Sequence, residues 1–278
     1  MSLQRAEFAL QNIETSFRFF AQRYGVAKQG SMHVERNVPE IDRILEEGAQ
    51  YIVAGHRLRD AETAETYSLL LLAFLDAMGY SQRSRRRPPM EQFRGILGRY
   101  LHSCGKFQHV RAAQGFALGD VDARQGDARR MDIADASIDA ILFSPPYSFA
   151  IDYVENDAFH LSALNVDRAE LENAMIGLRG GRKQADKYAC YLEDMETVLQ
   201  ECMRVLRAGR YCVVVIGTNI NQLSKILGVS ATEVMGLHQT LREQAEAIGF
   251  SYATHIPRSI KGIANTMRDE YILFLRKG

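Results

Sequence analysis

One short stretch of the sequence combines residue types that can hold a planar amino group. An apolar run, 138–143, leads directly into Ser144, Pro145, Pro146 and Tyr147. The two prolines stiffen the backbone and remove two N–H donors, so the carbonyl oxygens of Ser144 and Pro145 become fixed hydrogen-bond acceptors. Tyr147 adds a flat face on which a ring can stack. The simpler alternative is a strand followed by a proline-stiffened turn with a core tyrosine.

The pattern around this stretch is that of an α/β sheet. After Gly119, short apolar runs alternate with amphipathic segments, which is typical of βαβ units and a mainly parallel sheet. Ligands bind beyond the carboxyl ends of the strands in such sheets, where Ser144 would lie. The predicted strands are 121–124, 138–143, 211–216, 252–256 and 271–275, and the predicted helices are 158–164, 188–206 and 234–248.

The first part of the chain has a helical pattern from about residue 4 to 107, with apolar residues three and four positions apart. We predict a helix start at Pro39 and a helix over 61–78 that Gly79 ends. The arginine-rich segment 83–89 is either a solvated linker or a loop that contacts phosphates. These features divide the chain into a helical region, 1–115, and an α/β domain, 116–278.

Composition narrows the possible functions. The chain has 278 residues, 46% of them hydrophobic, with 34 basic and 34 acidic residues, so any contact with nucleic acid must come from local patches. Its four cysteines have neither CxxC spacing nor a histidine at the spacing of a metal ligand, which predicts free thiols and no metal site. The longest apolar run, 69–75, is too short to cross a membrane. We therefore expect a cytoplasmic protein.

The stretch Ser144-Pro145-Pro146-Tyr147 resembles the catalytic motif of the amino-methyltransferases, Ser/Asn/Asp-Pro-Pro-Tyr/Phe. The serine form is more similar to the cytosine-N4 DNA enzymes than to the adenine-N6 enzymes. The resemblance implies S-adenosylmethionine as methyl donor and the exocyclic amino group of a flipped-out base as acceptor. It also implies that these four residues are catalytic and that Phe143 and Ser144 border the cofactor.

Neighbouring segments extend the resemblance over about residues 120 to 278. Asp127 and Ala128 lie in a segment similar to the one whose acidic residue contacts the cofactor adenine, although an aspartate there is also a common helix cap. Segment 204–219 resembles the helix, turn and fifth strand of the class I methyltransferases, a Rossmann-like fold whose last strand runs antiparallel to its neighbours. The residues implied to bind the target base are Phe149, Asp152, Tyr153 and Arg179.

One part of the family's pattern is missing. These enzymes carry an Asp/Asn-Pro-Phe-x-Gly-x-Gly loop after the first strand, and no segment of this sequence matches it. In that family the first two strands lie between the third and the fourth, so the predicted sheet is incomplete. Three explanations are open for the two missing strands: a partner chain supplies them, the N-terminal half supplies them in a form that the pattern does not reveal, or the sequence is a fragment. We favour a split enzyme, with the glycine loop on a second chain.

The sequence therefore predicts a DNA methyltransferase, or a subunit of one, from a modification or restriction-modification system. DNA and the second chain are its expected partners. One alternative keeps the chemistry and changes the acceptor to RNA or a protein glutamine. The other is a catalytically silent scaffold with the same fold, which the missing loop favours and the intact Ser-Pro-Pro-Tyr motif opposes.

Overall fold

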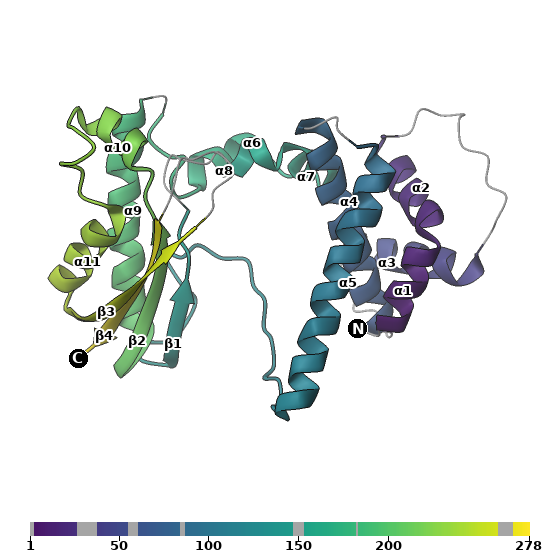
Figure 1. The fold of residues 1–278 in the computed structure, drawn as a ribbon, viewed down its shortest axis with the longest axis horizontal. Helices are drawn as coiled ribbons and strands as arrows, with labels where there is room; N and C mark the ends of the chain where they lie inside the picture. Colours follow the sequence, from purple (N-terminus) through teal and green to yellow (C-terminus); the bar gives the residue numbers. More distant parts are fainter. Residues whose placement is uncertain are drawn as a thin grey trace. The chain divides into compact units, whose positions relative to one another are not determined.

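The computed structural model describes residues 3–26, 38–54, 61–83, 87–146, 153–181, 183–260 and 269–278. They belong to two compact units, Met1–Val121 with Glu155–Val166, and Asp122–Val154 with Asp167–Gly278. The first, the helical unit, contains no strand in its described residues, and the second, the sheet unit, holds the sheet (Figure 1). The division predicted at 115/116 did not include residues 155–166 in the helical unit.

The helical unit is built around aromatic side chains. Phe74 lies 5.3 Å from Phe20, 5.6 Å from Phe17 and 6.1 Å from Phe93, measured between ring centroids. All four rings are buried. The helical pattern predicted for this region is confirmed in the described residues, including the helix start at Pro39. The helices are α1 (Leu3–Gln11), α2 (Ile13–Arg23), α3 (Pro39–Ala54), α4 (Ala61–Arg83), α5 (Pro89–Gln114) and α7 (Ala158–Ala163).

The prediction that Gly79 ends a helix is wrong, because α4 continues to Arg83. A Cβ on Gly79 would lie 3.2 Å from the His160 ring of α7. His160 is held by Asp76, one turn earlier on α4, at 3.0 Å. This glycine therefore permits a close helix contact. The second proline of the arginine-rich segment, Pro89, begins α5, in keeping with the preference for proline in a first turn.

The described residues of the sheet unit form four strands in the order β1-β2-β4-β3. β1 runs parallel to β2, and β4 runs antiparallel to both of its neighbours, which confirms the Rossmann-like α/β prediction and its antiparallel last strand. The sheet is not mainly parallel as predicted, because one pairing of the described strands is parallel and two are antiparallel. The strands are β1 (Ile138–Phe143), β2 (Leu206–Gly217), β3 (Phe250–Ser259) and β4 (Asp269–Lys277). The helices are α8 (Arg168–Ala174), α9 (Gln184–Val205), α10 (Ile220–Leu227) and α11 (Leu237–Ile248), while α6 (Tyr153–Asn156) crosses the boundary between the units.

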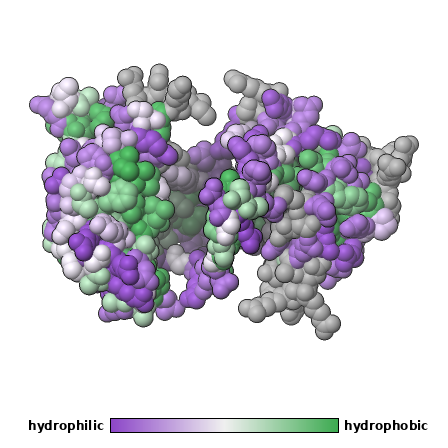
Figure 2. Space-filling model, turned by 60° about the horizontal axis from the view of Figure 1, so that its bottom comes forward, coloured by the Kyte–Doolittle hydropathy of each residue, from purple (hydrophilic) through white to green (hydrophobic). Residues whose placement is uncertain are grey.

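Helices cover one face of the sheet. β2 and β4 point buried side chains at α9 and α11, and the resulting core includes Val214, Leu241 and Leu273. The Lys277 ammonium at the end of β4 donates to the carbonyl oxygens of Met203 (2.6 Å) and Leu206 (2.7 Å), so it caps the end of α9. Elsewhere on this unit, apolar side chains reach the surface, at the left of Figure 2.

The strand predicted over 121–124 is wrong. Residues 116–126 form neither helix nor strand, and Val121 is 90% exposed. A strand exists only where a neighbouring strand accepts and donates its backbone hydrogen bonds. None of the four strands in the described part of the chain lies beside this segment. The described part of the chain therefore provides no strand with which 121–124 could pair.

Candidate active site

Ser144 lies at the carboxyl end of β1, next to the parallel strand β2. Its Oγ donates to the Val215 carbonyl oxygen at 3.0 Å, which fastens the end of β1 to β2. Pro145 is buried and Pro146 is half-buried, so the first three residues of the motif are fixed at this edge of the sheet. Phe143 is half-buried and packs against the sheet core. Three predicted site residues lie outside the described residues: Tyr147, Phe149 and Asp152.

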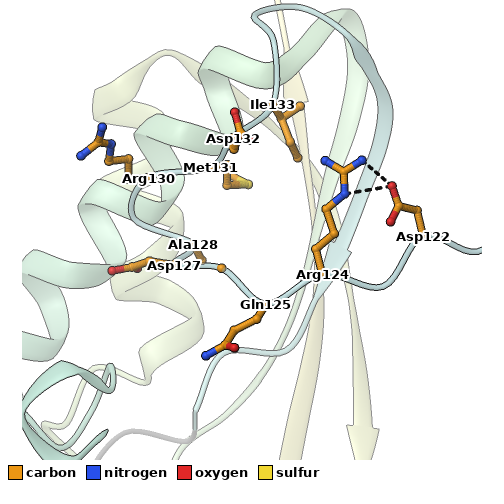
Figure 3. Close-up of a pocket in the computed structure, with 10 residues that line it drawn as sticks. Asp122, Arg124, Gln125, Asp127, Ala128, Arg130, Met131, Asp132 and Ile133 are labelled. Atoms are coloured by element: carbon orange, nitrogen blue, oxygen red, sulfur yellow. Dashed lines mark hydrogen bonds and ion pairs between the residues drawn. The ribbon is translucent and has the colours of Figure 1, made fainter. Parts of the chain in front are cut away.

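Asp127 and Ala128 line a pocket of about 700 Å³ (Figure 3). This volume is within the range of small-molecule sites, roughly 300–1,000 Å³. A single segment between Asp122 and Ile133 provides the lining, and Arg124 Nε donates to the Asp122 carboxylate at 2.9 Å. Asp127 and Ala128 therefore border an open concavity of suitable size made by one loop, whereas the other two predicted cofactor residues, Phe143 and Ser144, do not line it.

The carboxylate of Asp127 is bound by Arg129. Asp127 Oδ1 accepts from the Arg129 backbone N–H at 2.9 Å, and Oδ2 accepts from its Nη2 at 2.8 Å. These bonds lower the pKa of Asp127, with the guanidinium as the largest cause. Asp127 begins a tight turn in which Arg130 N donates to its carbonyl oxygen at 3.0 Å, and it caps no helix.

Arg129 continues to a buried carboxylate on α9. Its Nη1 donates to Asp194 Oδ1 at 3.0 Å, and Arg179 Nη2 donates to the same oxygen at 3.0 Å. The Asp194 side chain is only 4% exposed, and a carboxylate buried this far needs such partners. The structure thus joins Asp127 and Arg179, which the sequence suggested separately, through two residues that it did not single out.

Sequence reasoning missed Asp194, although a signal was present. It lies three residues after Tyr191 and four before Val198, on the apolar stripe of an amphipathic helix. An acidic residue on such a stripe requires a cation, and Arg129 and Arg179 provide it. We name this set of three residues the Asp194 cluster.

A second arginine attaches the pocket segment to α9. Arg204 Nη2 donates to the Met131 carbonyl oxygen at 2.9 Å, and Nη1 donates to that of Ile133 at 2.8 Å. Glu201 pairs with Arg204 at 2.8 Å and accepts from the Met131 N–H at 2.8 Å. Arg204 and this N–H lower the pKa of Glu201 to about 2. The pocket segment is therefore fixed to the helix at two points.

Tyr153, the remaining described residue of the predicted target-base site, begins α6 and is half-buried. Burial, followed by the nearby Tyr188 and Tyr153, raises the pKa of Tyr191 on α9. Among the described residues, no group of three or more His, Cys, Asp or Glu side chains could hold a metal ion, and all four cysteines are free. The helices that the structure describes include none with the length and apolar character of a membrane span.

No family model matches this chain, and no curated protein does. Solved structures with some likeness include a candidate DNA modification methylase from Thermus thermophilus, complexed with S-adenosyl-L-methionine (20% identity, 55% of this chain and 51% of that chain, TM-score 0.31). A SAM-dependent methyltransferase from Methanosarcina mazei is 10% identical over 60% of this chain and 74% of that chain, with a TM-score of 0.33. A candidate sarcosine dimethylglycine methyltransferase from Galdieria sulphuraria is 12% identical over 95% of this chain and 98% of that chain, with a TM-score of 0.30. This chain spans about half the length of the Thermus protein. Likenesses this distant do not assign it to a family.

Proposed function

We propose that this chain is the subunit carrying the catalytic motif of a cytoplasmic, S-adenosylmethionine-dependent DNA amino-methyltransferase, with cytosine N4 favoured over adenine N6 as acceptor. The observation that carries the proposal is the position of Ser144 and Pro145. They follow a parallel strand at its carboxyl end and are held there by the bond from Ser144 Oγ to Val215. This is the edge of the sheet where α/β proteins bind their ligands.

The backbone of the motif would hold the acceptor. Because the Ser144 hydroxyl is used for β2, the serine acts on the substrate through its carbonyl oxygen. That oxygen and the Pro145 carbonyl oxygen accept hydrogen bonds from the two N–H groups of an exocyclic amino group and thereby orient its nitrogen. Tyr147 stacks on the base. This arrangement orients the nucleophile and requires no strong general base.

The described residues fit one part of the cofactor. The pocket beside Asp127 and Ala128 has the volume for a nucleoside, and the Asp127 carboxylate is fixed at its border. When bound, S-adenosylmethionine supplies a methyl group on a positively charged sulfur. The glycine loop that would hold its methionine part is missing from the sequence, and we assign that loop to a second chain.

One observation favours the silent scaffold instead. Both oxygens of Asp127 already accept hydrogen bonds from Arg129, so an adenine amino group would have to compete with this guanidinium. If the chain is a silent scaffold, Arg129 occupies the Asp127 carboxylate in place of the cofactor adenine. The chain then only positions a partner. Methyl transfer decides between these functions.

The test is transfer of a tritiated methyl group to DNA by this chain, purified together with the glycine-loop polypeptide from the same genome. We expect N4-methylcytosine in the product, identified by mass spectrometry. Tyr147→Ala should lower transfer roughly 5- to 150-fold, since stacking on a base contributes roughly 1–3 kcal/mol. The control is Tyr80→Ala, at a half-exposed position on α4, which should transfer normally. Methylated RNA or protein with unmodified DNA would favour the other acceptors, and no product at all would favour the scaffold.

A further inference from the structure

The face of the sheet opposite α9 and α11 is apolar. The register places Leu142, Val213 and Phe274 in one row across β1, β2 and β4, and Val215, Ile272 and Ile256 in a second row across β2, β4 and β3. We call these six residues the open face. Leu142 is 72% exposed and Ile256 is 50% exposed, while the other four are partly exposed. Residues one position along the strands, such as Val214 and Leu273, are buried.

The described helices leave the open face uncovered. α9 and α11 pack against each other and both contact β2, so they lie on the same side of the sheet. The parallel pair of β1 and β2 would normally have both faces buried, whereas the antiparallel pairs β2/β4 and β4/β3 can have one face in water. Apolar surface is accordingly visible on the sheet unit (Figure 2).

The outer edge of β1 is open as well. Among the described strands β1 pairs only with β2, and this pairing is parallel. An unpaired strand edge presents N–H and C=O groups that another strand can take up. Leu142 lies where the open edge meets the open face. A single partner could therefore cover both.

Size determines what kind of partner fits. With about 4.8 Å between strands and about 3.3 Å per residue, four strands over six residues span roughly 400 Å². Ordinary monomers carry apolar patches of roughly 300–600 Å², and a stable interface buries roughly 800 Å² on each partner. The open face alone is too small, so the occupant must also use the edge of β1. A lone helix on the open face would not pair with the edge of β1.

We infer that the open face and the β1 edge bind a separate α/β polypeptide, which adds a strand parallel to β1 and lays a helix on the open face. The added strand would end at the same edge as Ser144, so a glycine loop that follows it would border the motif. This inference rests on the proposed function, because it identifies the occupant as the chain with the glycine loop. A second copy of this chain fits less well, since two-fold symmetry would pair β1 with itself in antiparallel orientation.

Hydrogen–deuterium exchange of this chain, alone and mixed with the glycine-loop polypeptide from the same genome, tests the interface. We expect the amides of β1 to exchange at least tenfold more slowly in the mixture, with the helical unit unchanged. Leu142→Lys and Ile256→Lys should each weaken the complex at least tenfold, because each places a charge on the open face. The matched control is Leu227→Lys on α10, a 46% exposed apolar residue of the same unit, which should bind as the wild type does.

The outcomes separate the interface from the activity. Protection of β1 without methyl transfer keeps the interface and rejects the proposed function. Methyl transfer by a complex in which β1 exchanges as before, or in which both lysine variants bind normally, overturns the interface. The interface is also overturned if β1 is protected in this chain alone while sedimentation velocity shows that the chain forms a dimer, because the occupant is then a second copy. A genome without a glycine-loop polypeptide overturns it too.

Discussion

The two units of this chain differ in how completely they bury their apolar side chains. The helical unit encloses its aromatic core between several helices, whereas the sheet unit buries one face of its sheet and leaves the other exposed. A helix satisfies its own backbone hydrogen bonds, but a strand depends on its neighbours. A set of helices can therefore form a finished core within one chain, while a sheet that lacks strands remains open at an edge and on a face.

The largest expected effect separates the two faces of the sheet. Leu273→Ala empties a fully buried position and should lower the free energy of unfolding of the sheet unit by about 2–5 kcal/mol. Leu142→Ala on the open face should change it by less than about 0.5 kcal/mol, because that side chain is mostly in water already. Urea unfolding followed by circular dichroism measures both. Equal losses would mean that the open face is covered within this chain.

The elements that were predicted correctly are those whose pattern and pairing partners both lie within this chain. The apolar run at 138–143 became β1, and the last strand is antiparallel, as expected. The segment 121–124, with Val121 and Ala123 as its apolar residues, was also predicted as a strand and is not one, because a strand depends on a neighbour that local sequence does not report. The same limit applies to the site, since the link between Asp127 and Arg179 passes through Asp194, far away along the chain.

The next effect concerns the attachment of the pocket segment to α9. Asp194→Asn keeps the shape of the side chain and removes the charge that faces Arg129 and Arg179, so it should cost about 1.5–3 kcal/mol of stability in the sheet unit. The control is Glu193→Gln, whose side chain is 69% exposed and meets Arg179 at 3.4 Å; it should change stability by at most about 1 kcal/mol. If Asp194→Asn were as stable as the wild type, the Asp194 cluster would not hold the segment.

In the helical unit, close packing makes one glycine necessary. A Cβ on Gly48 of α3 would lie 2.3 Å from the Tyr67 ring, so Gly48→Ala should lower the free energy of unfolding by about 1–3 kcal/mol. Gly98→Ala on α5 meets no atom within 4 Å and should raise stability by up to about 1 kcal/mol, because alanine favours helix. Thermal unfolding followed by circular dichroism at 222 nm distinguishes the two variants. A stabilising Gly48→Ala would contradict the tight contact between α3 and α4.

The smallest effect is a pH dependence in the sheet unit. The folded pKa of Glu201 is about 2, below its ordinary value of 4.5, so its pair with Arg204 stabilises the fold above pH 4.5. That contribution declines as the pH falls from 4.5 towards 2. The difference in Tm between the wild type and Glu201→Gln should accordingly be largest near neutral pH and disappear by about pH 2. A difference that does not vary with pH would show that the ionisation of Glu201 contributes nothing to stability.

The most direct test of the split-site account is calorimetric titration of S-adenosylmethionine into this chain, first alone and then with the glycine-loop polypeptide. Alone, the chain offers Asp127 and the Ser144 end of β1 but no glycine loop, and we expect no measurable binding. Adding the second polypeptide should produce stoichiometric binding, which Asp127→Ala then weakens. Tight, stoichiometric binding by the isolated chain would contradict the account, because the whole cofactor site would then lie within these 278 residues.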